Sequence, residues 1–173
     1  MARKEDSREI TYLAGAMDMV PDSGLGWREA TTPRLEALDI EVQDPIIMTN
    51  KLLHVSSAKD ARWALRRLAE EDEEKYYEIV DTIERQDLDA VLRSSFIITF
   101  WGWQIPTYGT VVENDTAARN KIPIYCVCFA PAYVLPNWFR KDIHRSGGQK
   151  FDDFEGLLRF LVLRKKIIER HNL

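Results

Sequence analysis

Two apolar runs in the second half of the chain frame its most informative stretch. Residues 95–103 and 122–129 have the length and the β-branched and aromatic content of buried strands. Between them, residues 108–119 have helical character and carry Glu113. The pattern predicts a strand–loop–helix–strand unit with Glu113 in the first helical turn. In open parallel sheets such a position lies at the carboxyl edge, where ligands bind.

Shorter apolar runs and an amphipathic stretch alternate in the first part of the chain. Residues 10–16 and 40–42 are typical of strands. Residues 27–38 show a helical pattern in which Pro33 should mark the beginning or a kink. Residues 46–57 fit neither pattern. The first part of the chain therefore predicts two strands separated by one helix.

The middle of the chain is helical in pattern and heavily charged. Residues 57–94 carry a basic cluster followed by an acidic one, which is typical of a solvated helix with many ion pairs. Asp87 begins a new helical turn, capped by that acid, just before the third strand. Residues 130–148 contain two prolines and two glycines and are typical of a loop. Residues 151–162 begin a final amphipathic helix.

Strands separated by helical stretches predict an α/β fold. We expect a mostly parallel five-stranded sheet covered by helices on both faces. With right-handed crossovers the expected strand order is 2-1-3-4-5, a flavodoxin-like or Rossmann-like three-layer sandwich. The 173 residues are expected to form one domain, residues 1–173.

Composition and charge narrow the classes of partner. The net charge of −4 gives no electrostatic basis for binding nucleic acid polymers or anionic membranes. No apolar stretch approaches the ~20 residues of a membrane span, and the charged start is not a signal peptide, so we expect a cytoplasmic protein. Cys126 and Cys128 alternate within one strand, a poor geometry for pairing that fits a reducing compartment. The three histidines are isolated, so no metal site is expected.

Three polar groups could converge at the carboxyl edge of the sheet: Tyr12, Asp87 and Glu113. A carboxylate there is a useful nucleophile toward an anomeric carbon, because a nearby anion stabilises an oxocarbenium-like transition state. A phenol bonded to that carboxylate would fix its orientation, and a second acid could protonate a leaving base. Each group also has a structural explanation. Glu113 could be a favourable first-turn residue, Tyr12 a core aromatic and Asp87 a helix cap.

The sequence lacks other common site motifs. Gly24-Leu25-Gly26 has no third glycine at the spacing of a dinucleotide-binding loop, and the first strand ends eight residues earlier. There is neither a Walker lysine nor the G-x-S-x-G of a hydrolase serine. A dinucleotide site and a serine-hydrolase site are therefore not expected.

Six different short motifs occur one after another along the chain. They are Tyr12-Leu13-Ala14-Gly15-Ala16-Met17-Asp18, Gly26-Trp27-Arg28, Asp44-Pro45, Asp87-Leu88-Asp89, Gly109-Thr110-x-x-Glu113 and Phe151-Asp152-Asp153-Phe154. Together they resemble the nucleoside 2-deoxyribosyltransferase family, which is related to deoxynucleoside 5′-monophosphate N-glycosidases. The similarity spans most of the chain apart from about residues 46–80, where this sequence carries a charged helical insertion.

The resemblance implies a flavodoxin-like fold and a double displacement that uses no cofactor and no metal. Glu113 would attack C1′ of a 2′-deoxyribonucleoside, release the base and hold the sugar covalently until a free nucleobase takes it. Tyr12 would orient Glu113, and Asp87 would act at the leaving base as proton donor or hydrogen-bond partner. The sugar and base pocket would be lined by Gly15, Met17, Asp18, Asp44, Gly109 and Thr110.

The resemblance also implies an assembly. Members of the family are oligomeric, and a neighbouring chain helps to close each site. We therefore expect a homo-oligomer, a dimer or larger. Residues 130–148, with Asn137 and Trp138, are the candidate contribution from the neighbour.

The sequence departs from the family pattern in three places. Ala16 stands where many members have proline, and Asn114 follows Glu113 where a hydrophobic residue is more usual. Residues 101–108 lack the acid with which some members contact the base. Gln104 or the neighbouring tryptophans would then contact the base instead.

Two alternatives to the transferase stay open. A deoxynucleoside 5′-monophosphate N-glycosidase would give the sugar to water and would need a phosphate nest, for which Ser23, Gly24, Gly26 and Arg28 are candidates. A non-catalytic nucleotide-binding domain would keep the pocket. That domain would have no need of a nucleophile.

Overall fold

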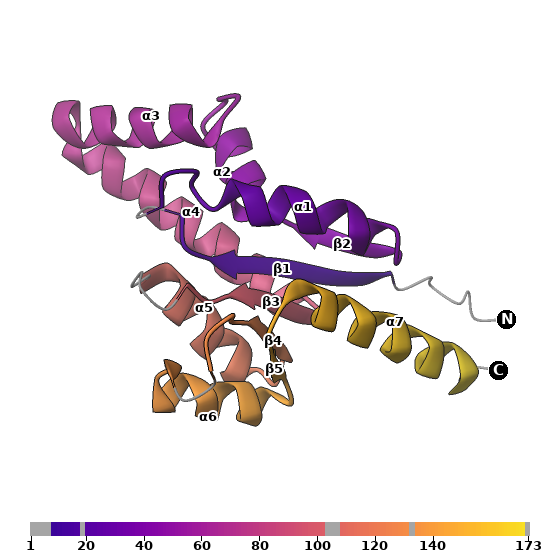
Figure 1. Ribbon diagram of the computed structural model, residues 1–173. Helices are drawn as coiled ribbons and strands as arrows, with labels where there is room; N and C mark the ends of the chain where they lie inside the picture. The colour runs from indigo at the N-terminus through magenta and orange to yellow at the C-terminus, as the bar shows by residue number, and fades with distance from the viewer. Residues whose placement is uncertain (1–7, 18–19, 103–107, 132–133, 172–173) are drawn as a thin grey trace, which may run out of the picture.

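A five-stranded parallel sheet forms the centre of the molecule. The computed structural model describes residues 8–17, 20–102, 108–131 and 134–171 (Figure 1). The strands are β1 (Glu9–Gly15), β2 (Ile40–Gln43), β3 (Phe96–Phe100), β4 (Ile124–Val127) and β5 (Gln149–Phe151). Their order is β2-β1-β3-β4-β5, and every neighbouring pair is parallel. The predicted α/β class and strand order are confirmed.

Helices cover both faces of the sheet. On one face lie α1 (Leu25–Glu36) and α7 (Phe154–His171), and on the other lie α4 (Glu73–Arg93), α5 (Tyr108–Arg119) and α6 (Asn137–Ser146). Side chains of β1 alternate between the two cores: Leu13 packs with the α1–α7 side, and Tyr12 with the α4–α6 side. Burial on both faces explains why β3 and β4 are continuous apolar runs.

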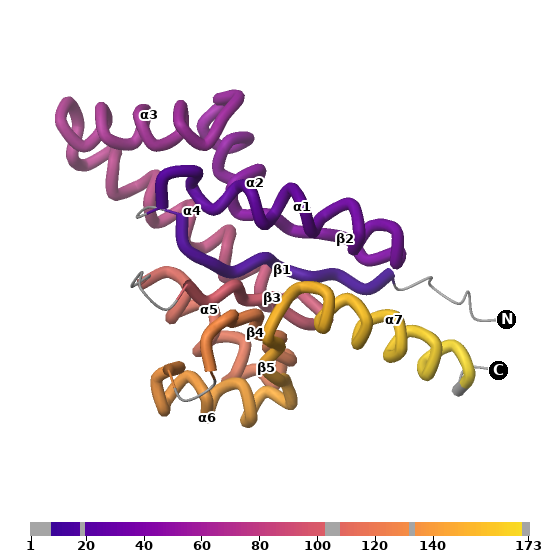
Figure 2. The backbone as a smooth tube through the Cα atoms, viewed as in Figure 1, coloured from indigo at the N-terminus to yellow at the C-terminus, as the bar shows by residue number. Residues whose placement is uncertain are grey.

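Two further helices join β2 to α4. They are α2 (Pro45–Leu52) and α3 (Ala58–Glu71), and α3 packs along α4. The tube in Figure 2 shows α3 and the beginning of α4 extending past the sheet as a helical pair. None of the helices in the described ranges is long and apolar enough to cross a membrane.

Two helix boundaries differ from the prediction and change the setting of Asp87 and Glu113. Helix α4 is continuous, and its N-terminal cap is Asp72, whose side chain accepts a hydrogen bond from the Lys75 amide at 3.1 Å. Asp87 therefore lies inside a helix and is not a cap. Helix α5 runs from Tyr108, which places Glu113 in its second turn. Because the dipole effect is concentrated in the first turn, other groups must set the ionisation of Glu113.

The predicted loop over residues 130–148 contains helix α6. Pro136 immediately precedes the helix, and Gly147 ends it with a left-handed φ of 79°. A proline before a helix and a glycine after it are start and stop signals for that helix. The same residue types are also typical of loops, which is why the sequence predicts a loop here. Strand β5 follows at once and has three residues, of which only Phe151 is fully buried. It was therefore too short to stand out as an apolar run.

Pro33 was predicted to mark either the beginning of α1 or a kink in it. It lies inside α1, three residues before the end of that helix at Glu36, so it does not begin the helix. A proline this near the C-terminus removes one late hydrogen bond and leaves the first two turns intact. Residues 46–52, part of the stretch that the pattern leaves unassigned, lie in α2, which Asp44 caps by accepting a hydrogen bond from the Ile46 amide at 2.9 Å.

Candidate active site

Strand β1 and helix α5 bring Tyr12 and Glu113 into direct contact. Tyr12 is fully buried, and its hydroxyl donates a hydrogen bond to Glu113 Oε1 at 2.8 Å. The strand alternation that turns Leu13 toward α1 and α7 turns the Tyr12 phenol toward α5. A hydrogen bond from a residue of the sheet therefore holds one carboxylate oxygen of Glu113 in place.

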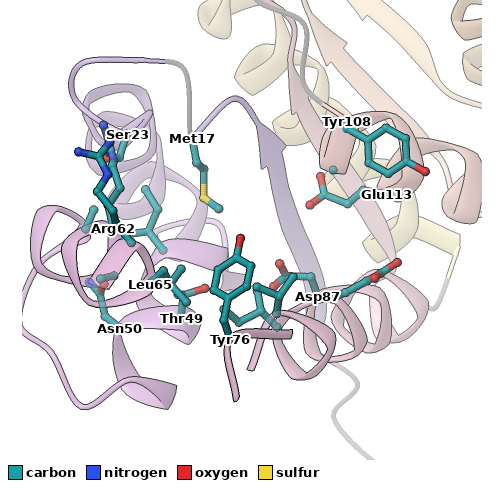
Figure 3. Close-up of a pocket in the computed structure, with 18 of the residues that line it drawn as sticks. Met17, Ser23, Thr49, Asn50, Arg62, Leu65, Tyr76, Asp87, Tyr108 and Glu113 are labelled. Carbon is teal, nitrogen blue, oxygen red and sulfur yellow. The ribbon is translucent and has the colours of Figure 1, made fainter. Parts of the chain in front are cut away.

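Asp87 reaches the same place from helix α4. It is 8% exposed, and it lines a cavity of about 680 Å³ together with Glu113 (Figure 3). Asp87 Oδ1 and Glu113 Oε2 are buried and have no hydrogen-bond partner among the described residues. Because a buried polar oxygen normally has a partner, these two atoms mark a place where a ligand or water would bind.

Burial moves the pKa values of both carboxyls upward, and the charge of Glu113 moves that of Asp87 further. Burial raises the pKa of Glu113 to about 7, against the Tyr12 hydrogen bond and the positive charge of Arg28, which lower it. Burial, followed by the negative charge of Glu113, raises the pKa of Asp87 to about 8. The pKa of Asp87 is thus raised further from its ordinary value than that of Glu113, which favours the proton on Asp87. Two acids with separated pKa values can serve as nucleophile and proton donor.

The pKa of Tyr12 is raised well above 10, first by burial and then by the charges of Glu113 and Asp87. The phenol consequently stays neutral near pH 7. A neutral hydroxyl donates its hydrogen bond to Glu113 throughout the range in which that carboxylate is charged.

Arg28 lies beneath this cluster as a fully buried cation. Its guanidinium donates hydrogen bonds to the carbonyls of Gly24, Leu13 and Gly15 at 2.9, 3.2 and 3.1 Å. Its Nε is 3.6 Å from Asp44 Oδ1. Arg28 thus holds the loop after β1 in place. With these donors directed at protein carbonyls, it is not the phosphate ligand that the N-glycosidase alternative required.

The glycine amides of the same loop are also engaged. Asp22 accepts hydrogen bonds from the Gly24 and Gly26 amides at 3.0 and 3.1 Å. These bonds, led by the one from Gly26, lower the pKa of Asp22, which keeps it ionised. An internal carboxylate therefore occupies the nest that the sequence suggested for a phosphate. Of the four candidate nest residues, Ser23 alone lines the cavity.

The structure separates the other predicted pocket residues into two groups. Met17 and Gly109 line the cavity, whereas Gly15, Asp44, Thr110 and Asn137 do not. Gly15 packs against Trp27, whose ring would lie 3.1 Å from an added Cβ. Asp44 caps α2, and Asn137 begins α6. Asp18 lies outside the described residues, so its predicted role stays a prediction.

Asn114 anchors helix α5 to the sheet. It accepts a hydrogen bond from Thr99 Oγ1 at 2.7 Å and donates one to the Thr110 carbonyl at 2.6 Å. It is 1% exposed, so both bonds are shielded from water. The polar residue after Glu113 therefore fixes the helix that carries Glu113, and makes no recorded hydrogen bond with the carboxylate itself.

The region expected to contact the base is only partly visible. Trp103 and Gln104 lie outside the described residues. Trp101 stacks on Phe139 of α6, with ring centroids 4.5 Å apart. It thus packs toward α6.

Sequence reasoning missed the far wall of the cavity, which comes from α3 and the first half of α4. The lining side chains there include Arg62, Leu65, Arg66, Tyr76 and Ile83. A signal was present, because positions 62, 65 and 66 share one face of a helix. The surrounding charge had led us to interpret this helix as a solvated one.

Comparison with known proteins gives structural likeness alone. No family model matches the chain, and no curated protein matches it. A conserved protein from Enterococcus faecalis V583 superposes with a TM-score of 0.59 at 14% identity, covering 91% of this chain and 99% of that one. A CMP N-glycosidase, BcmB, from Clostridium botulinum gives a TM-score of 0.47 at 15% identity, covering 90% and 99%. The first likeness shows that this chain has the fold of the Enterococcus protein.

Proposed function

We propose that this protein is a nucleoside 2-deoxyribosyltransferase, which cleaves the N-glycosidic bond of a 2′-deoxyribonucleoside and passes the sugar to another base. One observation carries the proposal: Glu113 and Asp87 line one cavity, each with an unpartnered carboxyl oxygen, and Tyr12 donates a hydrogen bond to Glu113. The motif resemblance to nucleoside 2-deoxyribosyltransferases supports it.

In the first step Glu113 Oε2 attacks C1′ of the sugar. Oε1 is held by Tyr12, so the free oxygen is the one available to form the bond. As the C1′–N bond breaks, its electron pair goes to the base nitrogen, and the Asp87 carboxylic acid protonates the base. The products are a free base, an ionised Asp87 and a deoxyribosyl ester of Glu113.

In the second step an acceptor base attacks C1′ from the side that the first base left. Asp87, now a carboxylate, removes the proton from the acceptor nitrogen as the new C1′–N bond forms. The ester C1′–O bond breaks, and its electron pair returns to Glu113. The second step thus restores both carboxyls to their initial protonation states. Water in place of the acceptor base would give hydrolysis instead.

One incubation tests the proposal. The protein is mixed with a 2′-deoxynucleoside, its 5′-monophosphate and a second free base, and the products are separated by chromatography. A nucleoside carrying the second base is the expected product. Free base together with free sugar or sugar phosphate would show that the enzyme hydrolyses its donor and does not transfer the sugar. Absence of turnover with both purine and pyrimidine donors would leave only a binding function and refute the enzyme.

The proposal includes a homo-oligomer in which a neighbouring chain helps to close the cavity. Helix α6 carries Trp138, which is 81% exposed, and it is the candidate element for this contact. Light scattering after gel filtration should give a dimer or larger species. An active monomer would contradict this part of the proposal.

A further inference from the structure

Two arginines of α3 face the cavity from the side opposite Glu113. Arg62 and Arg66 are four residues apart and therefore lie on one face of the helix, and both line the cavity. Figure 3 shows Arg62 beside Ser23 on one side of the cavity, with Glu113 on the other. The cavity therefore has a basic side as well as an acidic one.

Neither of these arginines is neutralised within the described part of the chain. The Arg62 guanidinium donates through Nη2 to the Ser23 hydroxyl and, at 3.4 Å, to the Val20 carbonyl, both uncharged groups. Arg66 has no ion pair or hydrogen bond there, and Glu84, the other charged residue of the far wall, is not paired with either arginine. Two guanidiniums beside one cavity attract an anion, because guanidinium forks match phosphate oxygens.

Arg67, the next residue along the helix, shows the contrast. It forms an ion pair with Glu71 at 2.8 Å, and its guanidinium lies over the Trp63 ring. It does not line the cavity. On helix α3, therefore, the two unpaired arginines border the cavity and the paired Arg67 does not.

The loop after β1 offers little to an anion except Ser23. Its glycine amides are bonded to Asp22, and Arg28 is bonded to backbone carbonyls. The Ser23 oxygen accepts the bond from Arg62, which leaves the hydroxyl proton free to donate to a ligand. An anion in the cavity would accordingly be bound mainly from α3.

We infer that Arg62, Arg66 and Ser23 form a phosphate subsite, and that the substrate is a nucleoside phosphorylated on its sugar. The assignment of base and sugar rests on the proposed function, whereas the anion subsite stands on its own contacts. The phosphate would bind at the α3 wall while C1′ lies against Glu113. The segment that interrupts the motif resemblance would thus select the substrate.

Binding to the inactive Glu113→Gln protein tests the subsite without turnover. Isothermal titration calorimetry would compare 2′-deoxynucleosides with their 5′- and 3′-monophosphates and with inorganic phosphate. We expect one monophosphate to bind at least about tenfold more tightly than the nucleoside, with a preference that weakens as salt is raised. Adding Arg62→Gln and Arg66→Gln should abolish the preference, and adding Arg67→Gln should leave it unchanged. Glutamine preserves helix propensity, and circular dichroism would verify folding.

The outcomes separate this inference from the proposed function. Equal affinity for nucleoside and monophosphates, or a preference that survives loss of both arginines, would overturn the subsite. Inorganic phosphate that binds as tightly as the nucleotide would overturn the nucleotide assignment. A phosphate preference that depends on both arginines would support the subsite. If the wild-type protein then cleaved no donor, the proposed enzymatic function would be refuted and the subsite would stand. Cleavage of nucleosides with no effect of a phosphate on binding would support the proposed enzymatic function and overturn the subsite.

Discussion

The hydroxyl of Tyr12 lies 2.8 Å from Glu113 Oε1, across 101 residues of sequence, and joins strand β1 to helix α5. The contact leaves the second oxygen of the carboxylate unpartnered at the cavity wall. It also lowers the pKa of a carboxyl that burial would otherwise raise further. One hydrogen bond therefore orients the proposed nucleophile and favours its charged form.

Replacing Glu113 with glutamine should abolish turnover. Glutamine can still accept the Tyr12 hydrogen bond, but it cannot form the ester with C1′, so we expect a loss on the order of 10⁴-fold or more in kcat. The melting temperature should be unchanged or higher above pH 7, because a buried charge is removed. Glu84→Gln is the matched control, since Glu84 lines the same cavity. A folded Glu113→Gln protein with normal rate would refute the assignment.

Tyr12→Phe should move the acidic limb of the pH–rate profile upward. Without the phenol, the pKa of Glu113 rises above about 7, so a higher pH is needed to ionise it. A lost bond to a charged group corresponds to a drop in kcat of roughly 10- to 100-fold at neutral pH. The profile of kcat against pH distinguishes this from general damage. A lower rate with an unshifted limb would mean that Tyr12 has only a packing role.

Asp87→Asn should remove proton donation to the leaving base. We expect kcat to fall by about 10²- to 10⁴-fold with an ordinary nucleoside, and the alkaline limb near pH 8 to disappear. With a 7-methylguanine deoxynucleoside as donor, whose base leaves without protonation, kcat should fall much less. Equal losses with both donors would show that Asp87 does not act as the acid.

The same substitution should stabilise the fold at alkaline pH. The pKa of Asp87 rises from 3.8 to about 8 on folding, so the folded state binds this proton more tightly than the unfolded chain. Its contribution to stability is therefore present at low pH and is lost as the pH rises toward 8. Asparagine removes that loss, and urea titrations at pH 8.5 should give a gain on the order of 2–4 kcal/mol. At pH 4 the gain should vanish.

Arg28→Lys should destabilise the protein far more than Arg34→Lys in the same helix. Lysine cannot reach three carbonyls and Asp44 together, so buried acceptors and a buried charge would lose their partner. We expect a loss of about 3–5 kcal/mol in the free energy of unfolding, measured by urea titration. Arg34 is exposed and pairs with Glu155 at the surface, so its replacement should have little effect. Comparable stabilities would contradict the structural role of Arg28.

Four of the five strands could be predicted from the sequence, because the alternation of apolar strands and helices is visible locally and general rules of topology then give their order. Apolar runs located the first four strands, and parallel strands place their carboxyl ends at one edge. The meeting of Tyr12 with Glu113 was therefore predictable. The continuity of α4 through Asp87 was not, since an acid before a strand resembles a cap until the packing of the whole helix is known.

The far wall of the cavity depends on how two helices lie across each other. A charged amphipathic helix can face solvent or line a cavity, and its sequence looks the same in both cases. The packing of α3 along α4 places Arg62 and Arg66 at the cavity, which Arg67 does not line. The hydrogen bonds from two glycine amides to Asp22 could not be predicted from the sequence either, because turn geometry decides which amides a carboxylate reaches.

The clamp formed by Asn114 and Thr99 has a consequence for engineering. The clamp ties the helix that carries Glu113 to β3, whereas α3 packs mainly on the helices α2 and α4. The reacting carboxyl and the recognition wall are thus built on separate supports. A combinatorial library confined to the cavity face of α3 should yield variants with new donor preferences and an unaltered nucleophile, which makes this helix the natural target for directed evolution.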